Sequence, residues 1–410
     1  MQTTAKRWLA LTGFVASTLL IIVLSSGAFA ADKGVVKADP NGLADLEERI
    51  AELEATVAKK GNRKVSLEVS GVINKALVWY DAGSGASDWN VGDNSNSPSY
   101  LQFKAVTTIT SSWKAGGVVQ INFGDYEFAG TGGYGHLGGG TDGISVRQSY
   151  LFIQGSVGKF SLGKLSQATD EITQINTSNA GVVSTPLSLR PLVGANGIGE
   201  ALDIFDGGRA NAVRYDITRW GFTLSASAAQ ADIDSGGNTD GTIWDVALRY
   251  EGEAQGFQVK AGVGYRDGLA IEQTDFGFMK FGANIADIQV ASGSASVMHV
   301  PTGIFVTGAA GQVDVTDYFA GADKVRGYAV QGGLEERWNP LGKTTVYGEW
   351  GRWEFGNLLG DLKPEYMGLG VVQAIDQAAM EVYLTGRRYE TDGLLADDVD
   401  VVTAGARVRF

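Results

Sequence analysis

Apolar and polar residues alternate with a period of two over most of the chain. The last ten residues, Val401 to Phe410, carry Val, Ala or Phe at every even position and Thr, Gly or Arg between them. Segments 119–123, 222–228, 244–251 and 257–266 repeat this pattern. Because successive side chains of a strand point to opposite faces, each segment predicts a strand with one apolar and one polar face.

Two architectures suit such strands: a water-soluble sandwich and a transmembrane barrel. The polar faces carry Lys, Arg, Asp and Glu, which a sandwich core could not hold and a water-filled lumen can. Strands of about ten residues cross a bilayer at a tilt. Aromatic residues gather at strand ends, as in interfacial girdles, at Trp79-Tyr80, Trp113, Trp220, Trp338, Trp350 and Trp353. These features favour the barrel.

The connections alternate between short and long. Tight ones are expected near 113–117, 155–158, 218–221, 251–256, 301–303, 339–342 and 374–377. Long polar ones are expected near 81–98, 127–143, 165–208, 231–241, 267–284, 311–324, 354–364 and 391–399. They separate about sixteen strands, including one near 285–300 and one near 365–373. The sequence therefore predicts an all-β fold, a transmembrane antiparallel barrel over residues 63–410.

The first thirty residues are predicted to be a signal peptide. Lys6 and Arg7 precede an apolar stretch, and Ala28 and Ala30 form a small-x-small cleavage pattern. An uncleaved membrane anchor is the alternative. No later segment reaches 18 uncharged apolar residues, which excludes a helical membrane protein.

Residues 31–62 are expected to form a periplasmic segment with a helix at about 41–60. Apolar residues recur there with spacings of three and four, the seam of a coiled coil: Leu43, Leu46, Ile50, Leu53 and Val57. A seam this short needs a partner, which a symmetric homo-oligomer supplies. A single amphipathic helix lying on the body of the protein is the alternative.

Composition excludes several function classes. The net charge of −13 argues against nucleic-acid binding. The absence of Cys excludes thiolate metal sites and cysteine nucleophiles, and the two histidines, His136 and His299, lack nearby partners for a metal site or a catalytic pair. We therefore expect no cofactor and no enzyme activity. Clustered loop carboxylates would suit calcium, although no ligand spacing marks a site.

Four features of residues 64–410 are found together. The chain ends in Phe410, preceded at alternating positions by Val408 and Ala406. Segment 147–164 leads into the longest connection, 165–208, and segment 209–222, RANAVRYDITRWGF, leaves it. This arrangement resembles the general porins of Gram-negative bacteria, sixteen-stranded trimeric diffusion channels. The resemblance implies a homotrimer in the outer membrane, surrounded by lipid and lipopolysaccharide, and a last strand whose Phe410 is the signal read by the barrel-assembly machinery.

The resemblance also implies a pore constriction, in which the third loop, 165–208, folds inward and faces basic wall residues. The wall candidates by position are Lys104, Arg147, Lys164, Arg209 and Arg214, and the loop candidates are Asp170, Glu171, Glu200, Asp203 and Asp206. Structural salt bridges on the wall and ordinary solvated acids on the loop are the alternatives. Lys164 stands where the best-known members carry arginine, and their acidic-aromatic loop motif is not evident.

These observations predict an outer-membrane porin for passive diffusion of ions and small hydrophilic solutes, with a weak cation preference from the excess of acid. One alternative is a sugar-selective channel with an aromatic ladder, for which Tyr347 and Tyr383 could face inward whereas Tyr215 and Tyr265 face lipid. Another is an envelope tether that uses the N-terminal helix.

Overall fold

The computed structural model describes residues 65–81, 87–94, 96–124, 143–184, 187, 204–231, 241–269, 287–316, 323–356, 363–390 and 398–410. The predicted signal peptide, the coiled-coil seam, Glu200 and Asp203 lie outside these residues. Contacts divide the chain into two units, Met1–Leu67 and Glu68–Phe410, and the fold below is that of the second unit. In the described part of the chain, no helix is both long and apolar enough to cross a membrane.

Strands make up almost all of the described chain. They are β1 (Val65–Asp81), β2 (Ser87–Asp93), β3 (Tyr100–Thr110), β4 (Trp113–Gly124), β5 (Gly143–Gly155), β6 (Gly158–Ser166), β7 (Arg209–Arg219), β8 (Phe222–Ala231), β9 (Gly241–Ala254), β10 (Phe257–Leu269), β11 (Asp287–His299), β12 (Ile304–Thr316), β13 (Asp323–Asn339), β14 (Gly342–Phe355), β15 (Glu365–Ile375), β16 (Met380–Glu390) and β17 (Val399–Arg409). Two short 3₁₀ turns, η2 (Asn179–Val182) and η4 (Asp376–Ala378), interrupt them.

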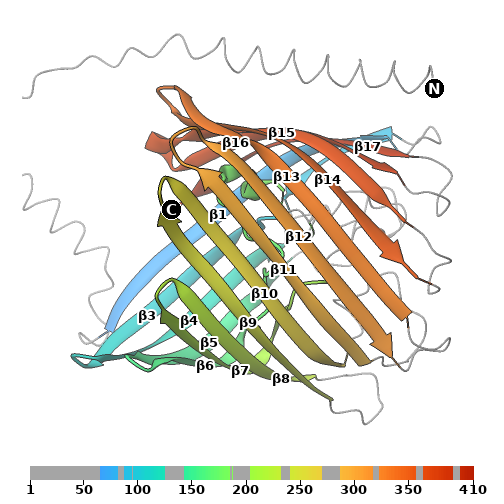
Figure 1. The fold of residues 1–410 in the computed structure, drawn as a ribbon. Helices are drawn as coiled ribbons and strands as arrows, with labels where there is room; N and C mark the ends of the chain where they lie inside the picture. Colours follow the sequence, from blue (N-terminus) through green and yellow to red (C-terminus); the bar gives the residue numbers. More distant parts are fainter. Residues whose placement is uncertain are drawn as a thin grey trace, which may run out of the picture. The chain divides into compact units, whose positions relative to one another are not determined.

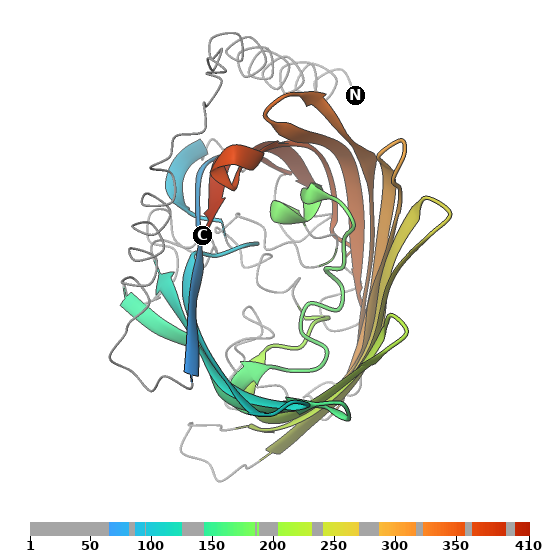
Figure 2. The same cartoon turned by 90° about the vertical axis from the view of Figure 1, so that its left-hand side faces the viewer.

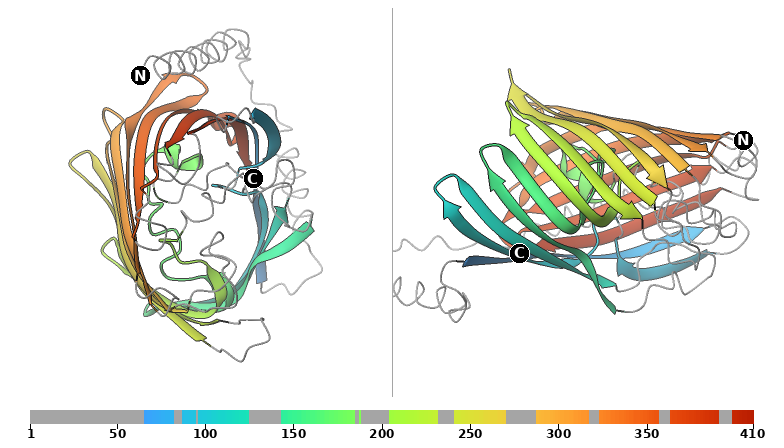
Figure 3. Two further views of the ribbon diagram at one scale, coloured as in Figure 1. Left: turned by 90° about the vertical axis from the view of Figure 1, so that its right-hand side faces the viewer. Right: turned by 90° about the horizontal axis from the view of Figure 1, so that it is seen from below.

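The strands form one closed sheet. From β3 to β17 each strand pairs antiparallel with the next, and β17 pairs with β1. Both β2 and β3 pair with β1, so they share one place in the ring. The result is a closed barrel with sixteen strand positions, whose strands are tilted (Figure 1) and form a ring when seen end-on (Figure 3). The predicted fold class and strand number are confirmed.

Three predicted connections are wrong in detail. The long loop expected near 311–324 begins later, because β12 continues to Thr316. The segment 113–117 belongs to β4, because the tight turn lies one step earlier, where Thr110 pairs with Trp113. The segment 81–98 is not one loop, because β2 forms a hairpin with β1 in which Trp89 lies opposite Trp79. The strands expected near 285–300 and 365–373 are present as β11 and β15.

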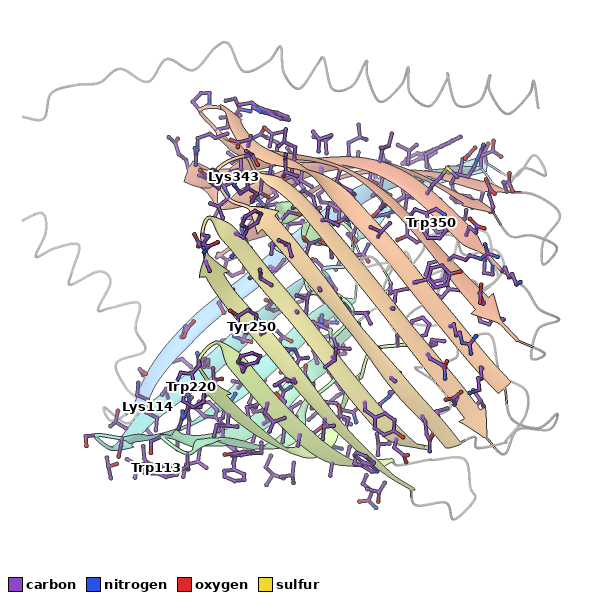
Figure 4. All side chains as sticks on the ribbon, viewed as in Figure 1. Trp113, Lys114, Trp220, Tyr250, Lys343 and Trp350 are labelled. Atoms are coloured by element: carbon purple, nitrogen blue, oxygen red, sulfur yellow. The ribbon has the colours of Figure 1, made fainter. Side chains whose placement is uncertain are left out.

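The two faces of the strands differ as the alternation predicts. On the outer face, Leu151 and Leu162 are 68% and 61% exposed, whereas Phe152, Ser161 and Leu165 of the same strands are buried on the inner face. Trp220 lies at the tight-turn end of the barrel and Trp350 lies toward the opposite end (Figure 4). Tyr80 and Trp353 are exceptions to the expected girdle: both are buried, on the inner face. Their strand position, and not their residue type, decides which side they face.

The barrel closes where the end of the chain meets β1. Gly71 and Phe410 exchange both backbone hydrogen bonds, at N···O distances of 2.8 and 3.1 Å. A Cβ at Gly71 would lie 2.6 Å from the Phe410 ring and 2.8 Å from the Tyr100 carbonyl oxygen. Closure therefore requires glycine at this position, because the ring of the last residue occupies the space a side chain would take.

We predict that Gly71→Ala weakens this closure by about 1–3 kcal/mol, the usual effect of forcing an extra methyl group into a packed site. The matched control is Gly308→Ala, since the nearest atom to a Cβ there, the Ala329 carbonyl oxygen, is 3.9 Å away. The temperature at which the folded band disappears in a heat-modifiability gel should fall for Gly71→Ala only. Equal temperatures for the two variants would contradict the prediction.

Candidate functional site

The described part of the connection between β6 and β7 lies inside the barrel. Its described residues are 167–184, 187 and 204–208, here called the inner loop, and Figure 2 shows it in green within the ring of strands. The loop begins and ends close together: Asp170 forms a parallel bridge with Gly207, and the Gly207 N–H donates to the Thr169 carbonyl oxygen at 3.2 Å. The loop is therefore a closed element standing on the ends of β6 and β7.

Asp206 fastens the base of the inner loop. Its carboxylate accepts hydrogen bonds from the Thr173 backbone N–H at 2.7 Å, the Thr173 hydroxyl at 2.9 Å and the Gln174 amide at 2.8 Å. The residue is only 5% exposed. The expected placement of Asp206 on the pore side of the loop is thus wrong, because its oxygens are used to hold the loop together.

The first part of the inner loop is held by β8 and β9. Asp245 accepts hydrogen bonds from the Thr169 N–H at 2.6 Å and the Thr169 hydroxyl at 2.8 Å. Ser227 accepts one from the Ala168 N–H at 3.0 Å. Arg249 donates to the carbonyl oxygens of Ala168 and Asp170, both at 2.8 Å. The wall therefore supplies both acceptors and donors to this backbone.

The middle of the loop crosses β11, β12 and β13. Ser294 accepts from the Ile175 N–H at 3.2 Å and donates to the Ile172 carbonyl at 2.7 Å, while Ser296 accepts from the Thr177 N–H at 3.0 Å. Asn176 donates to the Gln331 side chain at 2.7 Å. These partners follow one another around the wall, so the loop lies along it and does not span the open lumen.

The far end of the loop is held by buried charges. Glu335 accepts from the Asn179 N–H at 2.7 Å, and Glu349 accepts from the Ser184 hydroxyl. Glu349 also forms an ion pair with Arg387 at 2.6 Å, with side chains that are 0% and 2% exposed. Because each charge has a partner, the pair can be buried beneath the loop tip.

Glycines on the inner face make room for the loop. A Cβ at Gly311 or Gly327 would lie 2.4 or 2.5 Å from the Phe205 ring, and one at Gly262 would lie 2.5 Å from Ile175. Phe205 and Ile172 are 1% and 0% exposed. Apolar loop residues thus fill shallow slots where the wall has no side chain, which removes this half of the lumen from water.

A cavity of about 720 Å³ remains on the other side of the inner loop. Its basic lining residues are Arg147, Arg214, Arg249, Lys260 and Arg407, and its acidic ones are Asp170, Glu171 and Glu251. Uncharged polar side chains from Asn96, Ser97, Ser166, Gln174 and Asn176 complete much of the lining. The arrangement is a polar, charged passage that can hold water and small solutes.

The sequence-predicted wall residues are only partly brought together here. Arg147 and Arg214 line the cavity, and Lys104 lies on the inner face of β3, 3.7 Å from Glu68. Arg209 lies 3.4 Å from Asp170 and 3.5 Å from Glu171.

The expected placement of Lys164 on the pore wall is wrong. It is exposed, as are Phe160 and Leu162 on the outer face of the same strand, β6. The residues paired with it on neighbouring strands, Ser149 and Asn211, are exposed too. Strand alternation therefore directs Lys164 outward, away from the lumen.

Several lining residues were missed by the sequence analysis. Arg249, Glu251, Lys260 and Arg407 all line the cavity. Each occupies a polar position of an alternating strand, so the period-two pattern itself was a signal for their direction. Sequence alone gave no measure of their height along the barrel, which decides whether they meet the loop.

The inward-facing aromatic residues of β14, β15 and β16 are covered. Tyr347 and Tyr383 lie on the inner face as anticipated, and they are 2% and 4% exposed. Trp353, Tyr366 and Tyr389 form a tilted stack with centroid distances of 5.4 and 6.0 Å, also buried. In the described residues these rings do not form an open ladder. No group of three or more His, Asp or Glu side chains in these same ranges is placed to hold a metal ion.

We predict that Asp245→Ala loosens the first part of the inner loop. The substitution leaves the buried Thr169 N–H without its acceptor, which costs about 1–3 kcal/mol. Each 1.4 kcal/mol changes the equilibrium constant for opening of this part of the loop by about a factor of ten. Amide hydrogen exchange at Thr169 should therefore accelerate by about tenfold or more. Asp314→Ala, which removes a carboxylate on the outer face, is the control, and equal exchange in both variants would contradict the role of Asp245.

Comparison with known proteins agrees with this geometry. The family model described as Gram-negative porin matches residues 16–394. No curated protein sequence matches the chain significantly.

Similar solved structures include the anion-selective porin from Comamonas acidovorans, with a TM-score of 0.62 and 16% identity over 84% of this chain and 100% of that chain. The loop L8 deletion mutant of OmpT, an outer membrane protein of Vibrio cholerae, has a TM-score of 0.57 and 16% identity over 85% of this chain and 100% of that chain. OmpF of Salmonella typhi in complex with daunomycin has a TM-score of 0.53 and 14% identity over 85% of this chain and 98% of that chain.

At these identities the structural similarities show the fold, and the family match carries the assignment. The family match points to a channel rather than an enzyme. The chain therefore belongs to the Gram-negative porins and forms a passive diffusion channel in the outer membrane.

Proposed function

We propose that ions and small hydrophilic solutes cross the barrel through the cavity beside the inner loop, and that the charges lining it determine which ions pass. The observation that carries this proposal is the lining itself, which combines basic wall residues with the loop acids Asp170 and Glu171. Fixed charges facing a narrow, water-filled passage set ion preference.

The described lining favours anions. It contains five basic and three acidic side chains. Lys260, Arg214 and Arg407 form ion pairs with Glu251 at 2.8 Å, Asp216 at 2.8 Å and Glu381 at 3.2 Å. Arg249 instead hydrogen-bonds to loop carbonyl groups, which leave its positive charge in the passage. The similar porin of Comamonas acidovorans is described as anion-selective. The cation preference expected from the acidic excess of the whole chain stays a prediction, and the described passage gives it no support.

We also propose that the channel is a homotrimer without catalytic activity. One similar structure, OmpT of Vibrio cholerae, is described in a trimer form, with a TM-score of 0.53 and 14% identity. The proposed surroundings are outer-membrane lipid and lipopolysaccharide, reached after export through the cleaved signal peptide and insertion by the barrel-assembly machinery. The coiled coil at 41–60 would add contacts between subunits. A calcium ion in the acidic loops stays untested.

A sugar-selective channel is the second candidate. Tyr347, Tyr366 and Tyr383 are at most 4% exposed and so are not available to stack against a passing sugar. Tyr100 and Tyr250 line the cavity, but two rings are not the continuous ladder that such a channel needs.

The charge proposal is tested by reversal potentials of single channels in a KCl gradient. The wild-type channel should prefer chloride. A single solvated charge is worth up to about 1 kcal/mol on an ion at ~4 Å, so Arg147→Gln should lower the chloride-to-potassium permeability ratio by about two- to fivefold. Glu171→Gln, the matched variant of opposite sign, should raise it.

A wild-type channel that prefers potassium would overturn the proposed anion preference. Permeability ratios that stay unchanged in both variants would show that neither side chain faces the permeating ions. Folding of each variant is checked by its heat-modifiable migration, so that a loss of channels is not mistaken for a change in preference.

A further inference from the structure

A second segment enters the lumen, from the side opposite the start of the inner loop. Between β2 and β3 the chain leaves the wall at Asn94 and returns at Tyr100. We call Asn94 together with residues 96–99 the inner turn. Figure 2 shows it as a thin blue segment inside the ring of strands. Without this turn, β2 would continue directly into β3 along the wall.

The inner turn has a closed base. Asp93 is fully buried, forms an ion pair with Lys75 at 2.5 Å and accepts hydrogen bonds from the Ser99 N–H at 3.2 Å and the Ser99 hydroxyl at 3.1 Å. Within the turn, the Asn94 side chain accepts from the Asn96 N–H at 3.0 Å. Pro98 further restricts the backbone. These contacts fasten both ends of the turn to the end of β2.

The neighbouring wall also holds the inner turn. Asn74 of β1 donates to the Ser97 carbonyl at 2.9 Å and, through its backbone N–H, to the Ser99 hydroxyl at 3.0 Å. Tyr383 of β16 accepts from the Asn94 amide at 3.0 Å. Arg407 of β17 donates to the Ser97 hydroxyl at 3.1 Å. Three wall strands thus contact three residues of the turn, Asn94, Ser97 and Ser99.

The inner turn reaches the tip of the inner loop. The Asn96 amide donates to the Val183 carbonyl at 2.7 Å, and Arg387 donates to the same oxygen at 3.4 Å. Asn96, Ser97 and Pro98 also line the charged cavity. The loop and the turn therefore meet, and together they bound the cavity on the side of β16, β17 and β1.

We propose that the inner turn is a second constriction element, and that Asn96 and Ser97 are residues that limit the size and charge of the solutes that pass. The proposal rests on the function proposed above. Because the contact between Asn96 and Val183 connects the two inward segments, solutes must pass through the cavity beside Arg147 and Arg214 and cannot pass between the loop tip and the wall. A change of side chain on this turn therefore acts directly on the current.

Thiol modification tests this proposal cleanly, because the chain contains no cysteine. Single Asn96→Cys and Ser97→Cys variants are recorded in planar bilayers before and after reaction with a positively charged methanethiosulfonate. We expect single-channel conductance to fall by about a quarter or more, and the chloride preference to rise. The negatively charged reagent should lower conductance similarly and shift the preference toward potassium.

Thr108→Cys is the matched control. Its exposed side chain lies on the inner face of β3 and does not line the cavity, so modification there should leave conductance nearly unchanged. If mass spectrometry shows complete modification at positions 96 and 97 and both conductance and preference stay unchanged, the inner turn is not a constriction. A wild-type barrel that conducts no ions would instead contradict the proposed function, so the two failures are distinguishable.

Discussion

A loop can stay inside a barrel only if the wall supplies partners for its backbone. Here the wall does so from β8 to β16, beginning with Ser227 and Asp245 and ending with Arg387. Buried N–H and C=O groups without partners would each cost on the order of 1–3 kcal/mol, and the loop would then be more stable in the solvent outside. The position of the loop, the shape of the passage and the charges that line it all follow from this set of polar wall residues.

The consequence is a lumen with two unlike halves. On one side, Phe205 and other apolar loop residues pack into slots left by glycines, and the Glu349–Arg387 pair is buried beneath the loop tip. On the other side, the wall keeps its arginines and lysines in contact with a cavity of about 720 Å³. The inner turn closes the cavity at the junction of β1 and β17. Passive diffusion with a charge preference requires nothing further, because the solute moves down its own gradient.

Much of the fold could be predicted from the sequence, because a strand's period of two is visible in most strands, although not in β2. The same alternation indicates the direction of Arg249 and Lys260, although it does not show which lumen residues meet the loop. Lys164 was misplaced because a resemblance to other porins was given more weight than its position beside Leu162. Asp206 was misplaced because the sequence does not show which carboxylates of a loop accept hydrogen bonds from the loop itself. The inner turn could not be predicted, since its residues do not alternate between apolar and polar.

The measurement that tests the account most directly is the radius of the conducting passage. Single-channel conductance is recorded while neutral polyethylene glycols of graded size are added, and the smallest polymer that no longer enters the pore gives that radius. If the inner loop and inner turn narrow the lumen, the wild-type channel conducts without an energy source and excludes all but the smallest polymers. Larger polymers, of the size that an unobstructed sixteen-stranded barrel would admit, should not enter. If they do enter, the lumen is not narrowed, and if folded protein shows no conductance, the barrel is not a passive channel.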